Sequence, residues 1–140
     1  MEKYGNCQHL EYQVFDRCWG KFSESGEDNQ ITLNDNCNYK SAFPTTKSFR
    51  HTGSSMLAMD FDNNGLQDLI LGDMDFPFLF LLSNGGTADS THFVSVDTLF
   101  PSQNVPINLY SMPCPMLLNL SSDTIQDLLV SPIDLSLLKS

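Results

Sequence analysis

The sequence predicts an all-β fold, and three observations lead to this prediction. Only 17% of the 140 residues are charged, against about 25% in typical soluble domains, so uncharged polar side chains must cover much of the surface. The 41% of apolar residues, rich in phenylalanine, suffices for a core, and this composition favours strands over helices. Short aliphatic runs alternate with clusters of Asn, Asp and Gly, which is the pattern of strands joined by tight turns.

The expected strands are short and separated by turn-forming residues. In chain order they are residues 31–33, 56–59, 69–71, 78–82, 93–96, 105–110, 116–118 and 128–130. Phenylalanines at positions 76, 78 and 80 alternate, so one face of their strand is aromatic, and we expect that face to belong to the core. Prolines at positions 101, 106, 113 and 115 exclude a helix in that part of the chain.

A segment near the C-terminus echoes one from the middle of the chain. Residues 60–71 and 119–130 share a Gln-Asp pair followed by three aliphatic residues, and each follows a short apolar stretch. Their spacing of 59 residues matches a four-stranded blade of a β-propeller better than a turn of a solenoid. We therefore expect a loop-rich N-terminal segment with partial blade strands (1–53), a first repeat (54–113) and the start of a second, degenerate repeat (114–140).

These repeats would form antiparallel four-stranded blades, but the chain is too short to close a propeller. A closed propeller needs at least four blades, or about 240 residues at this period, so about two blades are present here. The expected architecture is an incomplete propeller that belongs to a longer protein. Closure by assembly of several copies is the alternative.

The turn between the strands at 56–59 and 69–71 predicts a calcium site. Its side-chain oxygens stand at loop positions 1, 3, 5 and 9, which are Asp60, Asp62, Asn64 and Asp68. Alternate residues of a tight turn can converge on one ion, Gly65 permits the sharp reversal, and the carbonyl of Leu66 would face the ion. Hard oxygen ligands suit Ca²⁺, and three carboxylates this close repel one another without a cation.

The composition of this loop also allows three other interpretations. An EF-hand is excluded because Leu71 stands where that loop needs a bidentate Glu. Asp-x-Asp pairs of the nucleotide-sugar kind occur at Asp60/Asp62 and at Asp73/Asp75, but pairs this short recur by chance. A solvated turn with Asx hydrogen bonds and no metal is the remaining alternative.

The segment 59–73 resembles the calcium loop of FG-GAP/VCBS-type repeats, in which DxDxDGxxD precedes an aliphatic strand. The continuation from Phe76 to Gly86 is similar to the bacterial surface versions of these repeats. The resemblance covers residues 54–86 and, in the second copy, residues 114–132. It implies β-propeller blades, as in integrin α subunits and many secreted bacterial proteins, and it implies the five calcium ligands named above, with Asn64 replacing the usual Asp.

The second copy departs further from the pattern of this family. Asn119, Ser121 and Asp123 occupy its first three ligand positions, Thr124 replaces the glycine, and Asp127 is retained. We expect this loop to be structural and mostly metal-free.

The resemblance implies a secreted or cell-surface protein with a role in adhesion or ligand display and without catalysis. The expected partners are the remainder of a larger propeller and an extracellular protein or glycan ligand. One alternative is a propeller-type enzyme or its accessory domain, with Asp73 or Asp75 as a catalytic carboxylate. Another is a metal-free structural spacer. The histidines at positions 9, 51 and 92 share no motif with a nucleophile or an acid.

The net charge limits the classes of partner that we expect, and the N-terminal residues and the cysteines bear on the cellular compartment. Seven Lys and Arg against 17 Asp and Glu give a net charge of −10, so no basic cluster exists to bind nucleic acid. The longest apolar run, 76–82, is far shorter than the roughly 20 residues of a membrane-spanning helix. Residues 1–10 lack the apolar core of a signal peptide. Cys18 and Cys37 bracket a polar loop and are the disulfide candidate, with four unpaired thiols as the alternative.

Overall fold

The computed structural model describes residues 2–6, 9–13, 18–24, 30–34, 53–74, 76–121 and 123–133. Every regular element within these ranges is a β-strand, and the strand pairs are antiparallel, so the all-β prediction is confirmed. The strands are β1 (Glu2–Asn6), β2 (His9–Gln13), β3 (Phe22–Glu24), β4 (Ile31–Leu33), β5 (Ser54–Met59), β6 (Asp68–Asp73), β7 (Leu79–Asn84), β8 (Phe93–Asp97), β9 (Pro113–Leu118) and β10 (Asp127–Pro132).

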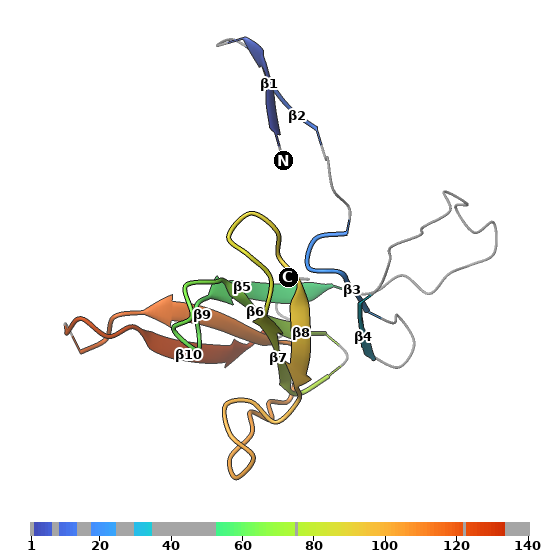
Figure 1. Cartoon of the computed structure of the whole chain (residues 1–140). Coiled ribbons are helices and arrows are strands. Elements are labelled where there is room, and N and C mark those ends of the chain that lie inside the picture. Colours follow the sequence, from blue (N-terminus) through green and yellow to red (C-terminus); the bar gives the residue numbers. More distant parts are fainter. Residues whose placement is uncertain are drawn as a thin grey trace, which may run out of the picture.

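A four-stranded meander, β5–β6–β7–β8, forms the centre of the structure (Figure 1). Its inner strand β6 is buried along its whole length, and β7 is buried at nearly every position. This explains why both strands are continuous aliphatic runs in the sequence, since a strand covered on both faces needs apolar side chains on both. Full burial of a side chain such as Ile70 stabilises the fold by roughly 1.5–3 kcal/mol.

Two-stranded hairpins cover the two faces of this meander (Figure 1). The hairpin β3–β4 places Phe22, Ile31 and Leu33 against one face. That face carries Leu69, Leu71, Phe80, Leu82 and Phe93. The hairpin β9–β10 places Leu128 and Val130 against the other face, which carries Leu57, Met59, Ile70, Leu79 and Leu81. The core is therefore two apolar layers, one on each side of the meander.

The contact between β9 and the meander is unusually close at Gly72. The hydroxyl of Ser55 donates a 2.6 Å hydrogen bond to the carbonyl of Pro113. A Cβ atom on Gly72 would lie 2.0 Å from that same carbonyl oxygen. The absence of a side chain at Gly72 is thus what lets the hairpin β9–β10 lie directly on β5 and β6.

The two aliphatic segments 69–71 and 128–130 both lie in strands, as the sequence predicts. Strands β9 and β10 begin and end 59 positions after β5 and β6, and both pairs are antiparallel hairpins. A four-stranded sheet occurs once in the described residues, alongside three two-stranded sheets. The described residues form no closed barrel, and the propeller with its segment boundaries at 53/54 and 113/114 stays a prediction.

The predicted strand at residues 105–110 is wrong. The backbone there makes single hydrogen bonds, from Ile107 to the Phe100 carbonyl and from Leu109 to the Pro77 carbonyl, instead of a ladder. Pro106 has no N–H to donate, which breaks any regular pairing at this point. The segment instead holds Phe100 in the core beneath the meander.

Candidate metal centre

The acidic loop joins β5 to β6, and strand pairing brings its two ends together. Met59, the last residue of β5, pairs with Asp68, the first residue of β6. Asp60, the first residue of the loop, therefore lies near Asp68, the residue that follows the loop in β6. The reversal is made by two residues in the left-handed region, Asn63 with φ of 59° and Gly65 with φ of 85°, a conformation that favours Asn and Gly.

Three of the predicted ligand side chains converge. One carboxylate oxygen from each of Asp60, Asp62 and Asp68 lies within 4.8 Å of the others. Each such pair of charges repels by about 1 kcal/mol in water and by several kcal/mol where the effective dielectric constant is lower. A cation bound among the three would turn this repulsion into attraction, so the cluster can hold a metal ion.

Backbone N–H groups of the loop hold the first two carboxylates in place. Asp60 accepts hydrogen bonds from the amides of Asn64 at 3.0 Å and Gly65 at 2.9 Å, and Asp62 accepts one from Asn64 at 3.1 Å. A metal-free Asx turn makes bonds of this kind too. The convergence of three charges, rather than the hydrogen bonding, is what distinguishes this loop from an ordinary turn.

Asp68 ties the loop to the next strand. Its side chain is only 1% exposed. One of its oxygens accepts the Phe61 amide at 2.9 Å, and the other accepts the Asn84 amide at 2.7 Å. A carboxylate has about four acceptor sites, so these two bonds leave capacity for a cation. Asp68 is thus a ligand candidate, and it is also a buried residue whose hydrogen bonds join the loop to β7.

Asn64 does not present its oxygen to the cluster as predicted. Its Oδ1 accepts the amide of Leu66 at 2.7 Å, while its Nδ2 donates to Asp62 at 3.0 Å. An amide N–H facing a carboxylate compensates part of that charge, which explains this orientation. Metal ligation by Asn64 would require its amide group to turn. The role of the Leu66 carbonyl stays a prediction.

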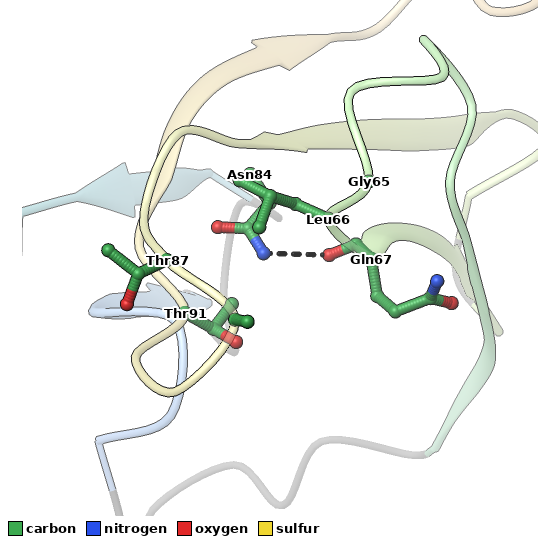
Figure 2. Close-up of a pocket in the computed structure, with 7 residues that line it drawn as sticks. Gly65, Leu66, Gln67, Asn84, Thr87 and Thr91 are labelled. Atoms are coloured by element: carbon green, nitrogen blue, oxygen red, sulfur yellow. Dashed lines mark hydrogen bonds between the residues drawn. The ribbon is translucent and has the colours of Figure 1, made fainter.

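Asn84 is the residue that sequence reasoning missed. Its Oδ1 accepts the amides of Gly86 at 3.0 Å and His92 at 3.2 Å, and its Nδ2 donates to the Gln67 carbonyl at 3.0 Å. Figure 2 shows this last bond joining Gln67 of the acidic loop to Asn84, the last residue of β7. The only signal in the sequence was an Asn before two glycines, which indicates a turn but not its contact with the loop.

A small hollow lies beside this hydrogen bond (Figure 2). Its volume is about 150 Å³, and its walls include Gly65, Leu66, Gln67, Asn84, Thr87 and Thr91. The lining is uncharged, and none of the three carboxylates belongs to it. The hollow is therefore adjacent to the acidic cluster of Asp60, Asp62 and Asp68 and not part of it.

The second loop keeps the turn of the first but not its charge. Asp127 accepts the Leu120 amide at 3.0 Å, as Asp68 accepts that of Phe61. Asp123 accepts the Ile125 amide at 2.9 Å, as Asn64 accepts that of Leu66. At the first position, however, the amide of Asn119 donates to the carbonyl of Asp123. Two carboxylates, of Asp123 and Asp127, stand where the first loop has three, and the expectation that this loop is mostly metal-free stays a prediction.

Other predicted residues fall partly outside the described ranges. Cys18 is disulfide-bonded and Cys114 is free, while the predicted partner Cys37 lies outside the described residues. Asp73 is buried at the end of β6, and Asp75 is not described.

The ring of His92 contacts Asn34 Oδ1 at 2.7 Å. This contact joins the hairpin β3–β4 to the segment just before β8.

Comparison of the chain with protein-family models, with curated proteins and with solved structures finds no match. In the part of the chain that the structure describes, no helix is long and apolar enough to cross a membrane.

Proposed function

We propose that the loop from Asp60 to Asp68 binds one Ca²⁺ ion, and that the ion fixes the turn between β5 and β6. The observation that carries this proposal is the convergence of three carboxylates within 4.8 Å at the two ends of one hairpin turn. Oxygen-only donors suit Ca²⁺ or Mg²⁺. Calcium is the better fit, because a flexible loop with protein oxygens accommodates its variable geometry, whereas Mg²⁺ demands a near-ideal octahedron.

The ion would stabilise more than its own loop. Asp68 accepts the Asn84 amide at the end of β7, and the Asn84 side chain in turn holds the turn that leads to β8. Calcium bound to Asp68 would therefore stabilise the packing of β6, β7 and β8 against one another. This supports a structural role for the metal in a binding or adhesion protein, and not a catalytic one.

We place this protein among secreted or cell-surface repeat proteins of the FG-GAP/VCBS kind, as part of an incomplete β-propeller. The resemblance of residues 59–73 to the calcium loop of those repeats supports this proposal, as does the stacking of a hairpin, a four-stranded sheet and a second hairpin. The disulfide at Cys18 fits an oxidising compartment. Calcium sites of extracellular modules bind at about 10⁻⁴–10⁻³ M. The ligand would be an extracellular protein or a glycan.

Thermal unfolding in calcium and in a chelator tests the metal. For a dissociation constant of about 10⁻⁴–10⁻³ M, about 10 mM Ca²⁺ stabilises the folded state by roughly 1.4–2.7 kcal/mol. This raises the melting temperature by roughly 3–22 °C, depending on the size of the cooperative unit. We expect Mg²⁺ at the same concentration to give a much smaller shift, and Asp60→Ala to abolish most of the calcium effect. A melting temperature that calcium leaves unchanged would refute the proposal.

A further inference from the structure

The chain contains two Asn-Gly pairs, Asn64-Gly65 and Asn84-Gly85. The first lies between β5 and β6, and the second begins at the last residue of β7. Asparagine before glycine readily loses its side-chain amide, because the glycine nitrogen has no Cβ beside it and can reach the side-chain carbonyl carbon. The two pairs share this intrinsic reactivity, so a difference between their rates must come from their surroundings in the fold.

The side chains of the two asparagines are held in the same way. Oδ1 of Asn64 accepts the amide of Leu66 at 2.7 Å. Oδ1 of Asn84 accepts the amide of Gly86 at 3.0 Å. Each is the hydrogen bond of an Asx turn, which folds the side-chain carbonyl back towards the following peptide. It also places an N–H donor on the oxygen that gains negative charge when a nucleophile attacks the carbonyl carbon.

The two glycine amides differ in the group that accepts their hydrogen bond. The N–H of Gly65 donates to Oδ2 of Asp60 at 2.9 Å, so a carboxylate lies within reach of proton transfer. The N–H of Gly85 donates to the backbone carbonyl of His92 at 2.9 Å, and a neutral carbonyl does not take up the proton. The first pair therefore has a general base on its nucleophilic nitrogen, whereas the acceptor described for the second is not a base.

Exposure also separates the two asparagines. Asn64 is exposed, and its Nδ2 donates to Asp62 at 3.0 Å and to the Asn84 carbonyl at 3.4 Å. Asn84 is only 3% exposed, and its Nδ2 donates to the Gln67 carbonyl at 3.0 Å. Loss of a side-chain amide releases ammonia and consumes water, so the reaction needs solvent at the side chain. Both differences favour reaction at Asn64.

We infer that Asn64 is a self-catalysed modification site, at which the acidic loop converts the side-chain amide to a carboxylate. Asp60 takes the proton of the Gly65 nitrogen as that nitrogen bonds to Cγ of Asn64. The bond from Cγ to Nδ2 then breaks, and Nδ2 leaves as ammonia with the proton, which gives a cyclic succinimide. Water opens this ring at Cγ to give aspartate, or at the backbone carbonyl to give isoaspartate. Overall, asparagine and water become an acid and ammonia, with no oxidant or cofactor.

The reaction changes the charge of the acidic loop. Its aspartate product carries a fourth carboxylate in the loop whose other three, from Asp60, Asp62 and Asp68, already converge. An additional negative charge strengthens the attraction for a cation. This consequence rests on the proposed calcium site, whereas the reaction itself needs no metal and is measured in a chelator. Failure of the calcium proposal would therefore leave the result at Asn64 unaffected.

Incubation of the full chain at neutral pH in a chelator tests the reaction. Mass spectrometry of chymotryptic peptides follows the conversion of amide to acid, and fragment spectra distinguish Asn64 from Asn63. In the folded chain we expect Asn64 to convert about tenfold or more faster than Asn84, because general-base catalysis typically contributes about 10²–10⁴-fold. In guanidinium chloride the two pairs should convert at similar rates, and Asn64 should react no faster than it does in the folded chain.

Two matched variants test the role of Asp60. Asp60→Asn keeps the shape of the side chain but removes the base, and it should slow the conversion of Asn64 about tenfold or more. Asp89→Asn removes an exposed carboxylate from the turn after β7 and should leave the rate unchanged. Circular dichroism checks that both variants fold. If Asp60→Asn does not fold, the comparison of the folded and the unfolded parent decides.

Three results would overturn the inference. The first is an Asn64 rate that falls about tenfold or more when the parent chain folds. The second is an equal rate at Asn64 and Asn84 in the folded parent. The third is a folded Asp60→Asn variant in which Asn64 reacts as fast as in the parent.

Discussion

Replacing Asp68 by asparagine should destabilise the fold even without any metal. The two side chains have the same shape, but asparagine has one acceptor oxygen and one donor nitrogen. In the structure both oxygens of Asp68 accept backbone amides, from Phe61 at 2.9 Å and from Asn84 at 2.7 Å. In Asp68→Asn one of these amides therefore faces an N–H group and loses its partner.

The magnitude follows from the burial of the site. Asp68 is 1% exposed, so water cannot easily replace the lost bond. A hydrogen bond to a charged group contributes about 1.5–3 kcal/mol, and an unsatisfied buried donor costs about 1–3 kcal/mol. These two figures describe the same loss in part, and Asp68→Asn also removes the repulsion of Asp68 by Asp60 and Asp62, so we expect a net loss of about 1–3 kcal/mol. The matched change Asp127→Asn affects one described backbone bond at a half-buried residue and should cost about 1 kcal/mol or less.

Equilibrium unfolding in urea, in the presence of a chelator, measures both variants. A reduced midpoint with an unchanged slope is expected for Asp68→Asn, since the change affects stability and not the surface exposed on unfolding. Two results would refute the proposed role of the Asp68 hydrogen bonds. One is an equal loss of unfolding free energy for Asp68→Asn and Asp127→Asn, and the other is a loss below about 1 kcal/mol for Asp68→Asn.

Three other changes test separate parts of the structure. Asp127→Ala should leave the calcium-dependent shift in melting temperature almost unchanged, in contrast to Asp60→Ala, because the second loop has only two carboxylates. Gly72→Ala should cost about 1–3 kcal/mol and speed amide hydrogen exchange in β10, because its Cβ meets the Pro113 carbonyl; exchange as slow as in the parent would count against the close contact. Asn84→Ala should free the turn after β7 and increase limited proteolysis there, and an unchanged cleavage rate would argue against its anchoring role.

The inner strands β6 and β7 could be predicted because burial on both faces requires a continuous run of apolar residues in the sequence. Strand β6 combines three consecutive aliphatic residues with a preceding acidic turn, and the predicted strand 69–71 lies within its observed bounds, Asp68–Asp73. The segment 105–110 shows the opposite case. Its alternating Val105, Ile107 and Leu109 have strand periodicity. Pro106 has no N–H to donate, however, and the amides of Ile107 and Leu109 make single hydrogen bonds to the carbonyls of Phe100 and Pro77. Alternation in a sequence says nothing about whether a partner strand exists.

The residues of the acidic cluster could be predicted from the sequence, but the orientation of their neighbours could not. The spacing of Asp60, Asp62 and Asp68 predicts convergence, and the structure brings these three together. The orientation of Asn64 depends on which neighbour its amide meets, here Asp62 and Leu66, and spacing does not encode that choice. The anchoring role of Asn84 depends on a contact between segments 16 or more residues apart, which requires the fold to be known.

The most direct test of the calcium site is the number of ions bound per chain. Isothermal titration of the metal-free protein with Ca²⁺, with native mass spectrometry as a second readout, should give one ion per chain at about 10⁻⁴–10⁻³ M. Asp62→Asn retains the shape of an exposed side chain while removing one of the three charges, and it should weaken binding about tenfold or more. No bound ion in the parent protein, or one ion bound equally well by Asp62→Asn and by Asp60→Ala, would contradict the assignment of calcium to this loop.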